Sequence, residues 1–323
     1  MRKAERHARI VTVSVINSAG IDALRRTLVW GLPLPRGRVK DVRALRLRAK
    51  DERRLPVQCD AQARWPDGSV KWGLLTVPGL RVGAQQKTKL TLESGPAVPR
   101  PGILVRETAG GLRVNTGALR FVVRKQGSIA GDFFCRARDR WTKRADRLDL
   151  VMEVERAGKL TAYRAALEPS RRLQVESLGP FRAVIAVRGA HGAADGRMFG
   201  PYVLRFEVHA GSNALRLTHS VVFDGDPDRD FVRRSELILQ AAVGGGRRFA
   251  FGTDAGHEVR FERQRAAWLP DFRYAELYQD SATHFRVRRW VDLKRRAVFC
   301  EEGLQSDGWM ELAGSRGSVD SRN

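Results

Sequence analysis

The stretch Trp65-Pro66-Asp67-Gly68-Ser69-Val70-Lys71-Trp72 carries the strongest hairpin signal in the chain. Proline presets φ, aspartate bonds nearby backbone amides and glycine accepts positive φ, so Pro66–Gly68 predicts a sharp turn. Val70, Trp72 and Leu74 alternate with Lys71 and Gly73, which predicts one buried face on the second strand. The two tryptophans have two interpretations. They belong to the core of a β domain, or they form an aromatic platform for a sugar ring.

Short apolar runs separated by turn residues continue on both sides of this hairpin. Ile10–Ile16, Thr27–Gly31 and Lys87–Leu92 are examples, and no helical period interrupts them. Several short strands within about a hundred residues are typical of a small barrel or sandwich. The sequence therefore predicts a small β-barrel-like domain over residues 1–96. Two prolines and a glycine then predict a linker over residues 97–102.

The remainder of the chain, residues 103–323, repeats the strand-and-turn pattern on a larger scale. Arg182–Arg188, Tyr202–Val208 and Leu215–Phe223 are predicted strands, with turn residues between them. The pattern favours a large antiparallel β-sandwich, so the predicted fold class is all-β, a small barrel-like domain followed by a sandwich. The stretch Ser306–Asn323 turns polar and small, and no element there closes the sheet. We therefore expect the sandwich to be incomplete at its C-terminus.

Composition restricts the partners. The formal net charge is +23, which favours polyanions such as acidic polysaccharide or nucleic acid. The three cysteines lie far apart, so neither a disulfide framework nor a zinc knuckle is predicted. No run is long enough to span a membrane, and none has the pattern of a signal peptide. The sequence as given predicts a cytoplasmic protein without a membrane partner, or a secreted or periplasmic one if its true start lies upstream.

At two places the sequence resembles a known family, the exo-acting rhamnogalacturonan lyase-like proteins. Residues 63–72, preceded by Gly31-Leu32-Pro33-Leu34-Pro35-Arg36-Gly37, resemble their N-terminal barrel. Phe223-Asp224-Gly225-Asp226-Pro227-Asp228-Arg229-Asp230-Phe231 resembles part of their central β-sandwich. The resemblance implies a polysaccharide lyase that acts on pectin backbones by β-elimination at a uronate. Family proteins continue into a C-terminal α/α toroid, which has no counterpart in this sequence. The resemblance therefore implies a truncated gene product that is inactive alone, one half of a split protein that acts with a separate toroid chain, or a degenerate copy.

Such an elimination needs a cation to neutralise the carboxylate, a base for the α-proton and an acid for the leaving oxygen. Histidine and tyrosine suit the last two tasks, and the catalytic candidates are His219, His191 and Tyr202. His219 alternates with apolar residues, so it is either a core histidine or a general base. His191 lies among glycines, which favours a solvent-exposed loop, with a catalytic role as the alternative. Tyr202 is either a buried strand aromatic or an acid group.

The remaining candidates are binding residues. Trp65, Trp72, Arg229 and Arg233 are the predicted substrate-binding residues. Three alternating carboxylates predict a calcium site or a turn whose aspartates bond backbone amides, and these are Asp224, Asp226 and Asp228. Calcium is the one cofactor that the sequence suggests.

Three functions follow from these features. The first is a carbohydrate-active protein that resembles the lyases and binds an acidic polysaccharide or oligosaccharide. The second is a non-catalytic carbohydrate-binding or assembly module. The third is a basic polyanion or nucleic-acid binder, which ranks last because it depends on charge alone and no nucleic-acid motif supports it. Whether the chain is an enzyme is left open by the sequence.

Overall fold

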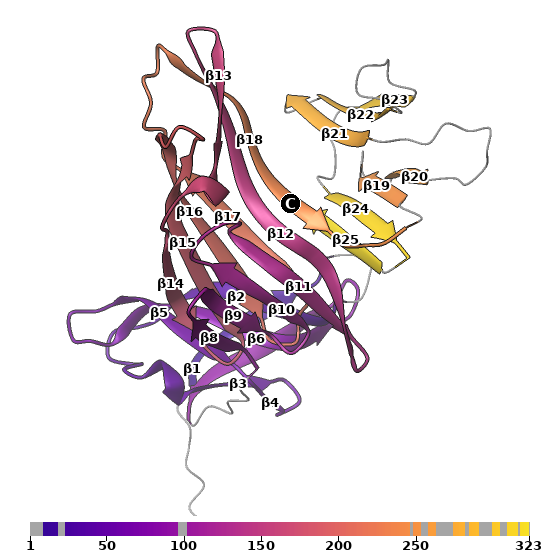
Figure 1. Ribbon diagram of the computed structural model, residues 1–323. Coiled ribbons are helices and arrows are strands. Elements are labelled where there is room, and N and C mark those ends of the chain that lie inside the picture. The colour runs from indigo at the N-terminus through magenta and orange to yellow at the C-terminus, as the bar shows by residue number, and fades with distance from the viewer. Residues whose placement is uncertain are drawn as a thin grey trace, which may run out of the picture. The chain divides into compact units, whose positions relative to one another are not determined.

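The structure is a computed structural model that describes residues 9–18, 23–95, 102–245, 248–252, 258–262, 274–281, 284–290, 299–303, 309–315 and 317–322. These residues form 25 strands and two short 3-10 helices, η1 (Val42–Ala44) and η2 (Ala165–Leu167). The predicted all-β fold class is confirmed (Figure 1). No helix among the described residues has the length and apolar character needed to span a membrane. The predicted linker lies outside the described residues, apart from Gly102.

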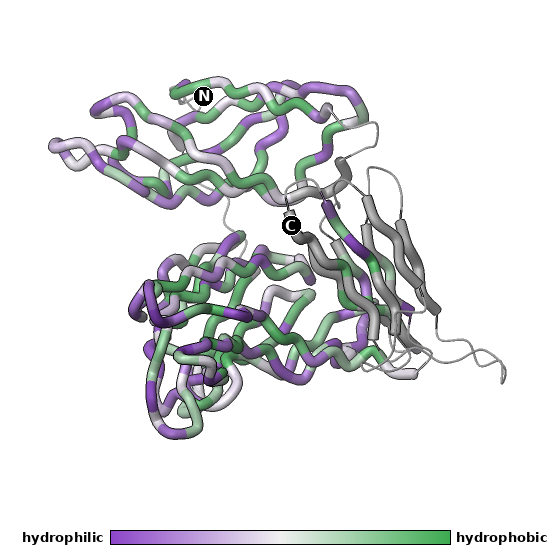
Figure 2. Tube along the Cα trace, turned by 90° about the horizontal axis from the view of Figure 1, so that it is seen from above, coloured by the Kyte–Doolittle hydropathy of each residue, from purple (hydrophilic) through white to green (hydrophobic). Residues whose placement is uncertain are grey.

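The chain folds into two compact units. One comprises residues 1–129 and 150–236, and the other comprises residues 130–149 and 237–323. Two long strands, β12 (Arg140–Arg156) and β18 (Asp230–Ala241), run from one unit into the other. Hydrophobic and hydrophilic residues alternate along many strands (Figure 2), as expected for sheets with one buried face.

The first unit begins with a barrel made of two small antiparallel sheets. One has the order β1-β7-β3-β4 and the other the order β2-β6-β5. Their strands are β1 (Arg9–Ile16), β2 (Ala23–Pro33), β3 (Leu45–Ala49), β4 (Arg54–Leu55), β5 (Gln58–Arg64), β6 (Val70–Val82) and β7 (Lys87–Ser94). Leucine and valine side chains from both sheets fill one core, including Leu47, Leu75, Val77 and Leu90, each with no exposed area.

The predicted hairpin forms between β5 and β6, but its buried face differs from the prediction. Val70, Leu75 and Val77 are buried, whereas Trp72 is 43% exposed, so the expectation that Trp72 lies on the buried face is wrong. The register between β5 and β6 shifts twice near Trp72, and each bulge changes which residues face the core. The Trp72 indole instead covers Gly31, where an added Cβ would lie 2.7 Å from the indole Nε1.

The first unit continues into the sandwich. Its strands are β8 (Leu104–Thr108), β9 (Gly111–Asn115), β10 (Leu119–Arg124), β13 (Lys159–Arg164), β14 (Arg172–Leu178), β15 (Arg182–Gly192), β16 (Met198–His209) and β17 (Leu215–Val221). β17, β16, β15, β13 and β12 are successive neighbours, with β14 paired to β15 and β18 to β12. β8, β9 and β10 form a meander that packs on this layer, since Phe121 stacks on Phe206 with ring centroids 5.9 Å apart. The sandwich prediction is confirmed.

A buried glutamine joins the barrel to the sandwich. The Gln58 Oε1 accepts hydrogen bonds from the amides of Phe181 and Arg182, both at 2.9 Å. Its Nε2 donates to the Arg182 carbonyl at 3.2 Å. Next to it, Arg182 Nη1 lies 3.4 Å from Asp60 Oδ2. This junction fixes the barrel against the strand pair that leads toward the candidate site.

The second unit contains β11 (Ala130–Ala137), which pairs with the first half of β12. Its other strands form two small sheets. One has the order β20-β19-β24-β25, with β20 (Glu258–Glu262), β19 (Arg248–Gly252), β24 (Trp309–Gly314) and β25 (Gly317–Arg322). The other consists of β21 (Tyr274–Ser281), β22 (His284–Trp290) and β23 (Phe299–Gly303). β24 and β25 lie in the polar stretch 306–323. They form a backbone-paired hairpin, which polar side chains permit.

Candidate functional site

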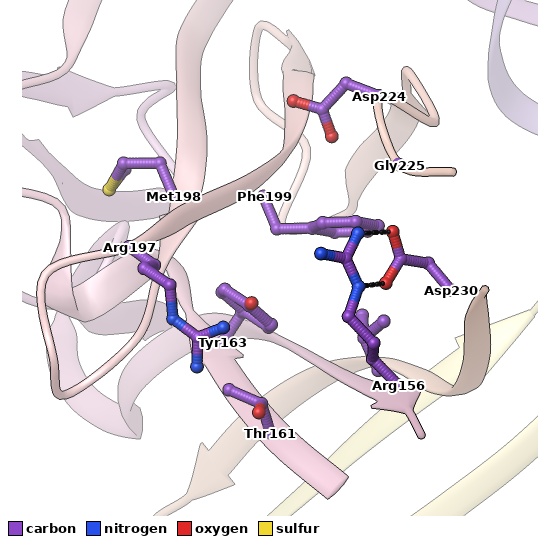
Figure 3. A pocket seen from close by; sticks show the side chains of 10 residues that line it. Arg156, Thr161, Tyr163, Arg197, Met198, Phe199, Asp224, Gly225 and Asp230 are labelled. Atoms are coloured by element: carbon purple, nitrogen blue, oxygen red, sulfur yellow. Dashed lines mark hydrogen bonds and ion pairs between the residues drawn. The ribbon is translucent and has the colours of Figure 1, made fainter. Parts of the chain in front are cut away.

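A pocket of about 290 Å³ opens in the sandwich where the C-terminal end of β12, the strand β13, the start of β16 and the loop after β17 meet (Figure 3). Its lining residues are Val154, Arg156, Thr161, Tyr163, Arg197, Met198, Phe199, Asp224, Gly225 and Asp230. This volume lies at the lower end of the range for small-molecule sites. All of these residues belong to the first unit.

One side of the pocket is held by an ion pair between Arg156 and Asp230. The Arg156 Nε donates to Asp230 Oδ1 at 2.5 Å, and its Nη2 donates to the other carboxylate oxygen. The Asp230 side chain is only 4% exposed, and the amide of Asp226 donates to it at 2.8 Å. The bonds from Arg156 and from this amide hold the pKa of Asp230 below its usual value. The pair therefore ties the end of β12 to the aspartate-rich loop.

Glycine is required where this loop passes the pocket. A Cβ added to Gly225 would lie 2.8 Å from both Asp230 Oδ2 and Phe199 Cε2. The loop is anchored at its other end by Asp224, whose Oδ1 accepts from the amide of Gly200 at 2.8 Å. The loop is thus anchored by the carboxylates of Asp224 and Asp230, and Gly225 lets its backbone approach the pocket.

The other side of the pocket is formed by the turn between β15 and β16. Asp195 Oδ1 accepts from the amide of Arg197 at 3.1 Å, and Asp195 Oδ2 accepts from Arg197 Nε at 2.9 Å. The Arg197 side chain is 53% exposed, so its guanidinium keeps donors available to a ligand. Figure 3 shows the Tyr163 ring between the guanidinium groups of Arg197 and Arg156, with Thr161 below it.

Two aromatic rings belong to the apolar part of the lining, together with Val154 and Met198. Tyr163 and Phe199 lie with centroids 5.4 Å apart and planes inclined by 37°. Aromatic rings present an apolar face to a sugar, and arginine binds a carboxylate through two parallel N–H donors. The pocket therefore combines the two features that an acidic sugar residue needs.

The three predicted catalytic residues come together, but inside the sandwich rather than in the pocket lining. The ring centroids of His191 and Tyr202 are 5.0 Å apart, and His219 lies 6.1 Å from each. His191 has no exposed area and Tyr202 is 2% exposed. His191 belongs to β15, so the interpretation of it as a solvent-exposed loop residue is wrong. The sandwich layers bury the ends of β15 and β16 together.

This burial decides the charge state of His219. Burial and the neighbouring His191 imidazole both lower the pKa of His219. His219 is therefore neutral at physiological pH. The His191 Nδ1 lies 2.8 Å from the Gly200 carbonyl, on the chain segment that also anchors Asp224. The cluster is thus linked to the pocket through Gly200, and the catalytic roles of its members remain predictions.

Glu168 is the member of this cluster that sequence reasoning missed. It follows η2, is 7% exposed, and accepts from the amide of Ala190 at 3.1 Å and from the Tyr202 hydroxyl at 3.2 Å. The Arg171 Nε lies 3.7 Å from Glu168 Oε2, the oxygen that also accepts from Tyr202. Burial raises the pKa of Glu168. No pattern marks this residue, since Leu167-Glu168-Pro169-Ser170 has the composition of an ordinary surface loop.

The predicted substrate-binding residues lie outside the pocket lining. Trp65 is at the barrel hairpin, where its Nε1 donates to the Leu34 carbonyl at 3.0 Å. Arg229 is paired with Asp226 at 3.9 Å, and Arg233 donates to Glu155 Oε2 at 2.8 Å. The Arg233 guanidinium also lies over the Phe231 ring, 5.3 Å from its centroid. Trp72, described above, belongs to the barrel as well. The binding roles of these residues remain predictions.

The aspartate loop binds its own backbone. Asp226 Oδ1 accepts from the amide of Asp228 at 3.0 Å, and Asp224 anchors Gly200. Within the described part of the chain, no group of three histidine, cysteine or acidic side chains is placed to hold a metal ion. The turn interpretation thus explains the observed bonds of Asp224 and Asp226, and the calcium site stays a prediction.

Comparisons with known proteins agree with this architecture. Residues 10–95 match the PcRGLX-like N-terminal RIFT barrel domain, and residues 103–245 match the PcRGLX-like protein central beta sandwich domain. The chain is also 27% identical over 240 residues to the uncharacterized protein YetA of Bacillus subtilis (strain 168). That similarity covers 71% of this chain and 27% of YetA, so the chain spans about a quarter of the length of this curated relative.

Proposed function

Because this chain belongs to the PcRGLX-like family, we propose that it is a carbohydrate-active protein whose sandwich pocket binds an acidic sugar. The observation that carries the proposal is the pairing of two arginines with an aromatic pair in one pocket. Arg156 is fixed by Asp230 and positions the aspartate loop, whereas Arg197 stands half-exposed at the mouth. A uronate carboxylate would bind Arg197, and the sugar ring would lie against Tyr163 and Phe199.

Arg197→Gln tests this assignment. We expect it to weaken the binding of trigalacturonate about tenfold, since one charge-assisted hydrogen bond is worth about 1.5 kcal/mol or more. Isothermal titration calorimetry with the full chain measures the change. The fold should be unaffected, because the Asp195 and Arg197 side chains are each 53% exposed and exposed ion pairs contribute little to stability.

The chain supplies a matched control. In Asp41-Val42-Arg43 the same geometry recurs outside the pocket, with Asp41 Oδ1 accepting from the amide of Arg43 at 2.9 Å and from its Nε at 3.1 Å. Arg43→Gln removes the same charge from the same kind of turn and should leave trigalacturonate binding unchanged. Equal weakening by both variants would show that net charge, rather than the pocket, attracts the sugar.

A lyase activity is the second candidate function, and Tyr163 is the observation that favours it. In a β-elimination a base removes the proton α to the uronate carboxylate, the bond from the β-carbon to its oxygen breaks, a carbon–carbon double bond forms, and the leaving oxygen takes up a proton. The Tyr163 phenol lies between the two arginines, where it could carry these protons. Asp224 and Asp230 are engaged with Gly200 and Arg156.

Absorbance at the band of the unsaturated product separates the two functions. A rise with rhamnogalacturonan or polygalacturonate as substrate supports the lyase. Binding of trigalacturonate without such a rise supports a non-catalytic carbohydrate-binding module. A separate α/α toroid chain remains a proposed partner for the catalytic case, and its addition to the same assay tests that proposal.

A further inference from the structure

The outward face of the meander β8–β10 is rich in arginine. The inward residues Leu112, Val114, Phe121 and Val123 are buried against the other layer. The nine positions of the opposite face are Leu104, Arg106, Thr108, Gly111, Arg113, Asn115, Arg120, Val122 and Arg124, as the strand registers place them. Four of these are arginines and none is acidic. Arg106, Arg113 and Arg120 are exposed. We call these nine residues the arginine face.

Two of the arginines stand directly opposite each other. Arg106 pairs with Arg113 across β8 and β9, so both side chains rise from the same face with Cβ atoms roughly 5 Å apart. Like charges in this arrangement destabilise a sheet. Among the residues that the structure describes, neither Arg106 nor Arg113 has a hydrogen-bond or ion-pair partner for its guanidinium. An anion placed between them would relieve the repulsion.

The charges continue across the third strand. Arg113 pairs with Val122, so Arg120 and Arg124 are its two diagonal neighbours on β10. Diagonal neighbours lie roughly 7–8 Å apart, and alternate residues of one strand roughly 6.7 Å apart. The arginines thus form an array over three strands. An array of this extent matches a polymer with regularly spaced anions better than a single small anion.

We propose that the arginine face binds an extended acidic polysaccharide chain as a second carbohydrate surface, distinct from the sandwich pocket. The choice of an acidic sugar polymer as the ligand rests on the proposed function, whereas the position of the binding surface rests on the opposed arginines alone. The face carries no aromatic residue on which nucleobases could stack, which disfavours single-stranded nucleic acid. Carboxylates along a polysaccharide need only guanidinium donors, which the face supplies.

The double variant Arg106→Gln/Arg113→Gln tests the proposal in the full chain. We expect polygalacturonate binding to weaken roughly tenfold, because two exposed charge contacts are lost. The difference in affinity between the variant and the wild type should become smaller as the salt concentration rises. Trigalacturonate, the proposed ligand of the pocket, should bind as before. Thermal stability should stay equal or increase, since the variant removes a repulsive pair. Isothermal titration calorimetry measures the binding of both ligands, and a thermal melt measures the stability.

The matched control is Arg43→Gln/Arg53→Gln, which removes the same two charges from exposed Asp-x-Arg turns in the barrel. It should leave polygalacturonate binding unchanged. Equal weakening by both double variants would overturn the proposal in favour of net charge. A larger loss of binding to single-stranded DNA than to polygalacturonate would overturn it in favour of a nucleic-acid surface. Arg197→Gln could leave trigalacturonate binding intact while the Arg106/Arg113 variant no longer binds the polymer. This result would refute the proposed sugar site in the pocket and support the arginine face.

Discussion

Glu168→Ala should lower the free energy of unfolding by about 3 kcal/mol, because it leaves a buried guanidinium without its carboxylate and two buried donors without an acceptor. The guanidinium is that of Arg171, whose side chain has no exposed area. The donors are the Ala190 amide and the Tyr202 hydroxyl. Urea denaturation followed by circular dichroism measures the loss.

The reason for the large effect lies in the backbone of β15. Its register with β16 shifts between Gly189 and His191, so the amide of Ala190 leaves the ladder and must find another acceptor. Glu168 supplies that acceptor. A Cβ added at Gly189 would lie 2.1 Å from Glu168 Oε2, so the glycine makes room for the carboxylate. The bulge, the glycine and the glutamate form one structural unit.

Glu168→Gln separates the hydrogen bonds from the charge. The glutamine carbonyl oxygen can still accept one of the two hydrogen bonds, so we expect a smaller loss, of about 1–2 kcal/mol. The pH dependence gives a second readout. Because burial raises the pKa of Glu168, the stability associated with its protonated form is present below pH 4.5 and is lost as pH rises through the raised value. Glu168→Gln should remove this decline. A decline of equal size in both proteins would contradict the assignment.

Strands in which apolar and polar side chains alternate could be predicted from the sequence, because the alternation itself indicates which residues are buried. Arg182–Arg188 and Tyr202–Val208 are both parts of observed strands, β15 and β16. β14 was missed, since its exposed residues Gln174, Val175 and Glu176 carry no alternation of burial. The exposure of the Trp72 side chain could not be predicted for a related reason. Bulges are set by the partner strand, and the sequence of one strand does not record them.

At the candidate site, too, some features could be predicted from the sequence and others could not. His191, Tyr202 and His219 were identified singly, and their proximity follows from three consecutive antiparallel strands, β15, β16 and β17. Strand alternation offered burial as one interpretation of Tyr202 and His219, whereas the burial of His191 could not be predicted, because it depends on what packs over the end of β15. Arg156 and Asp230 are 74 residues apart in sequence, and nothing local links them. The pocket exists only where the fold brings distant turns together. Asp224, Gly225 and Asp230 lie in the loop that the sequence analysis identified, whereas the other lining residues had no signal in the sequence.

Gln58→Ala should lower the free energy of unfolding by roughly 3 kcal/mol, the cost of leaving two buried amides, those of Phe181 and Arg182, without an acceptor. Gln58 is closely packed at this junction, since it is 6% exposed and a Cβ at Gly179 would lie 2.2 Å from its Cδ. Chemical denaturation measures the loss.

Hydrogen exchange locates this effect at the junction. The amides of Phe181 and Arg182 should exchange faster in Gln58→Ala, whereas the barrel amides of β3 and β7 (Leu45–Ala49 paired with Leu90–Ser94) should stay protected until global unfolding. Gln62→Ala is the matched control, since Gln62 lies on the same strand but is exposed and only reaches the Asp60 carbonyl at 3.5 Å. It should change neither stability nor exchange. If Gln58→Ala and Gln62→Ala behave alike, Gln58 does not hold the barrel to the sandwich. The Asp60–Arg182 ion pair would then be the contact that holds the two together.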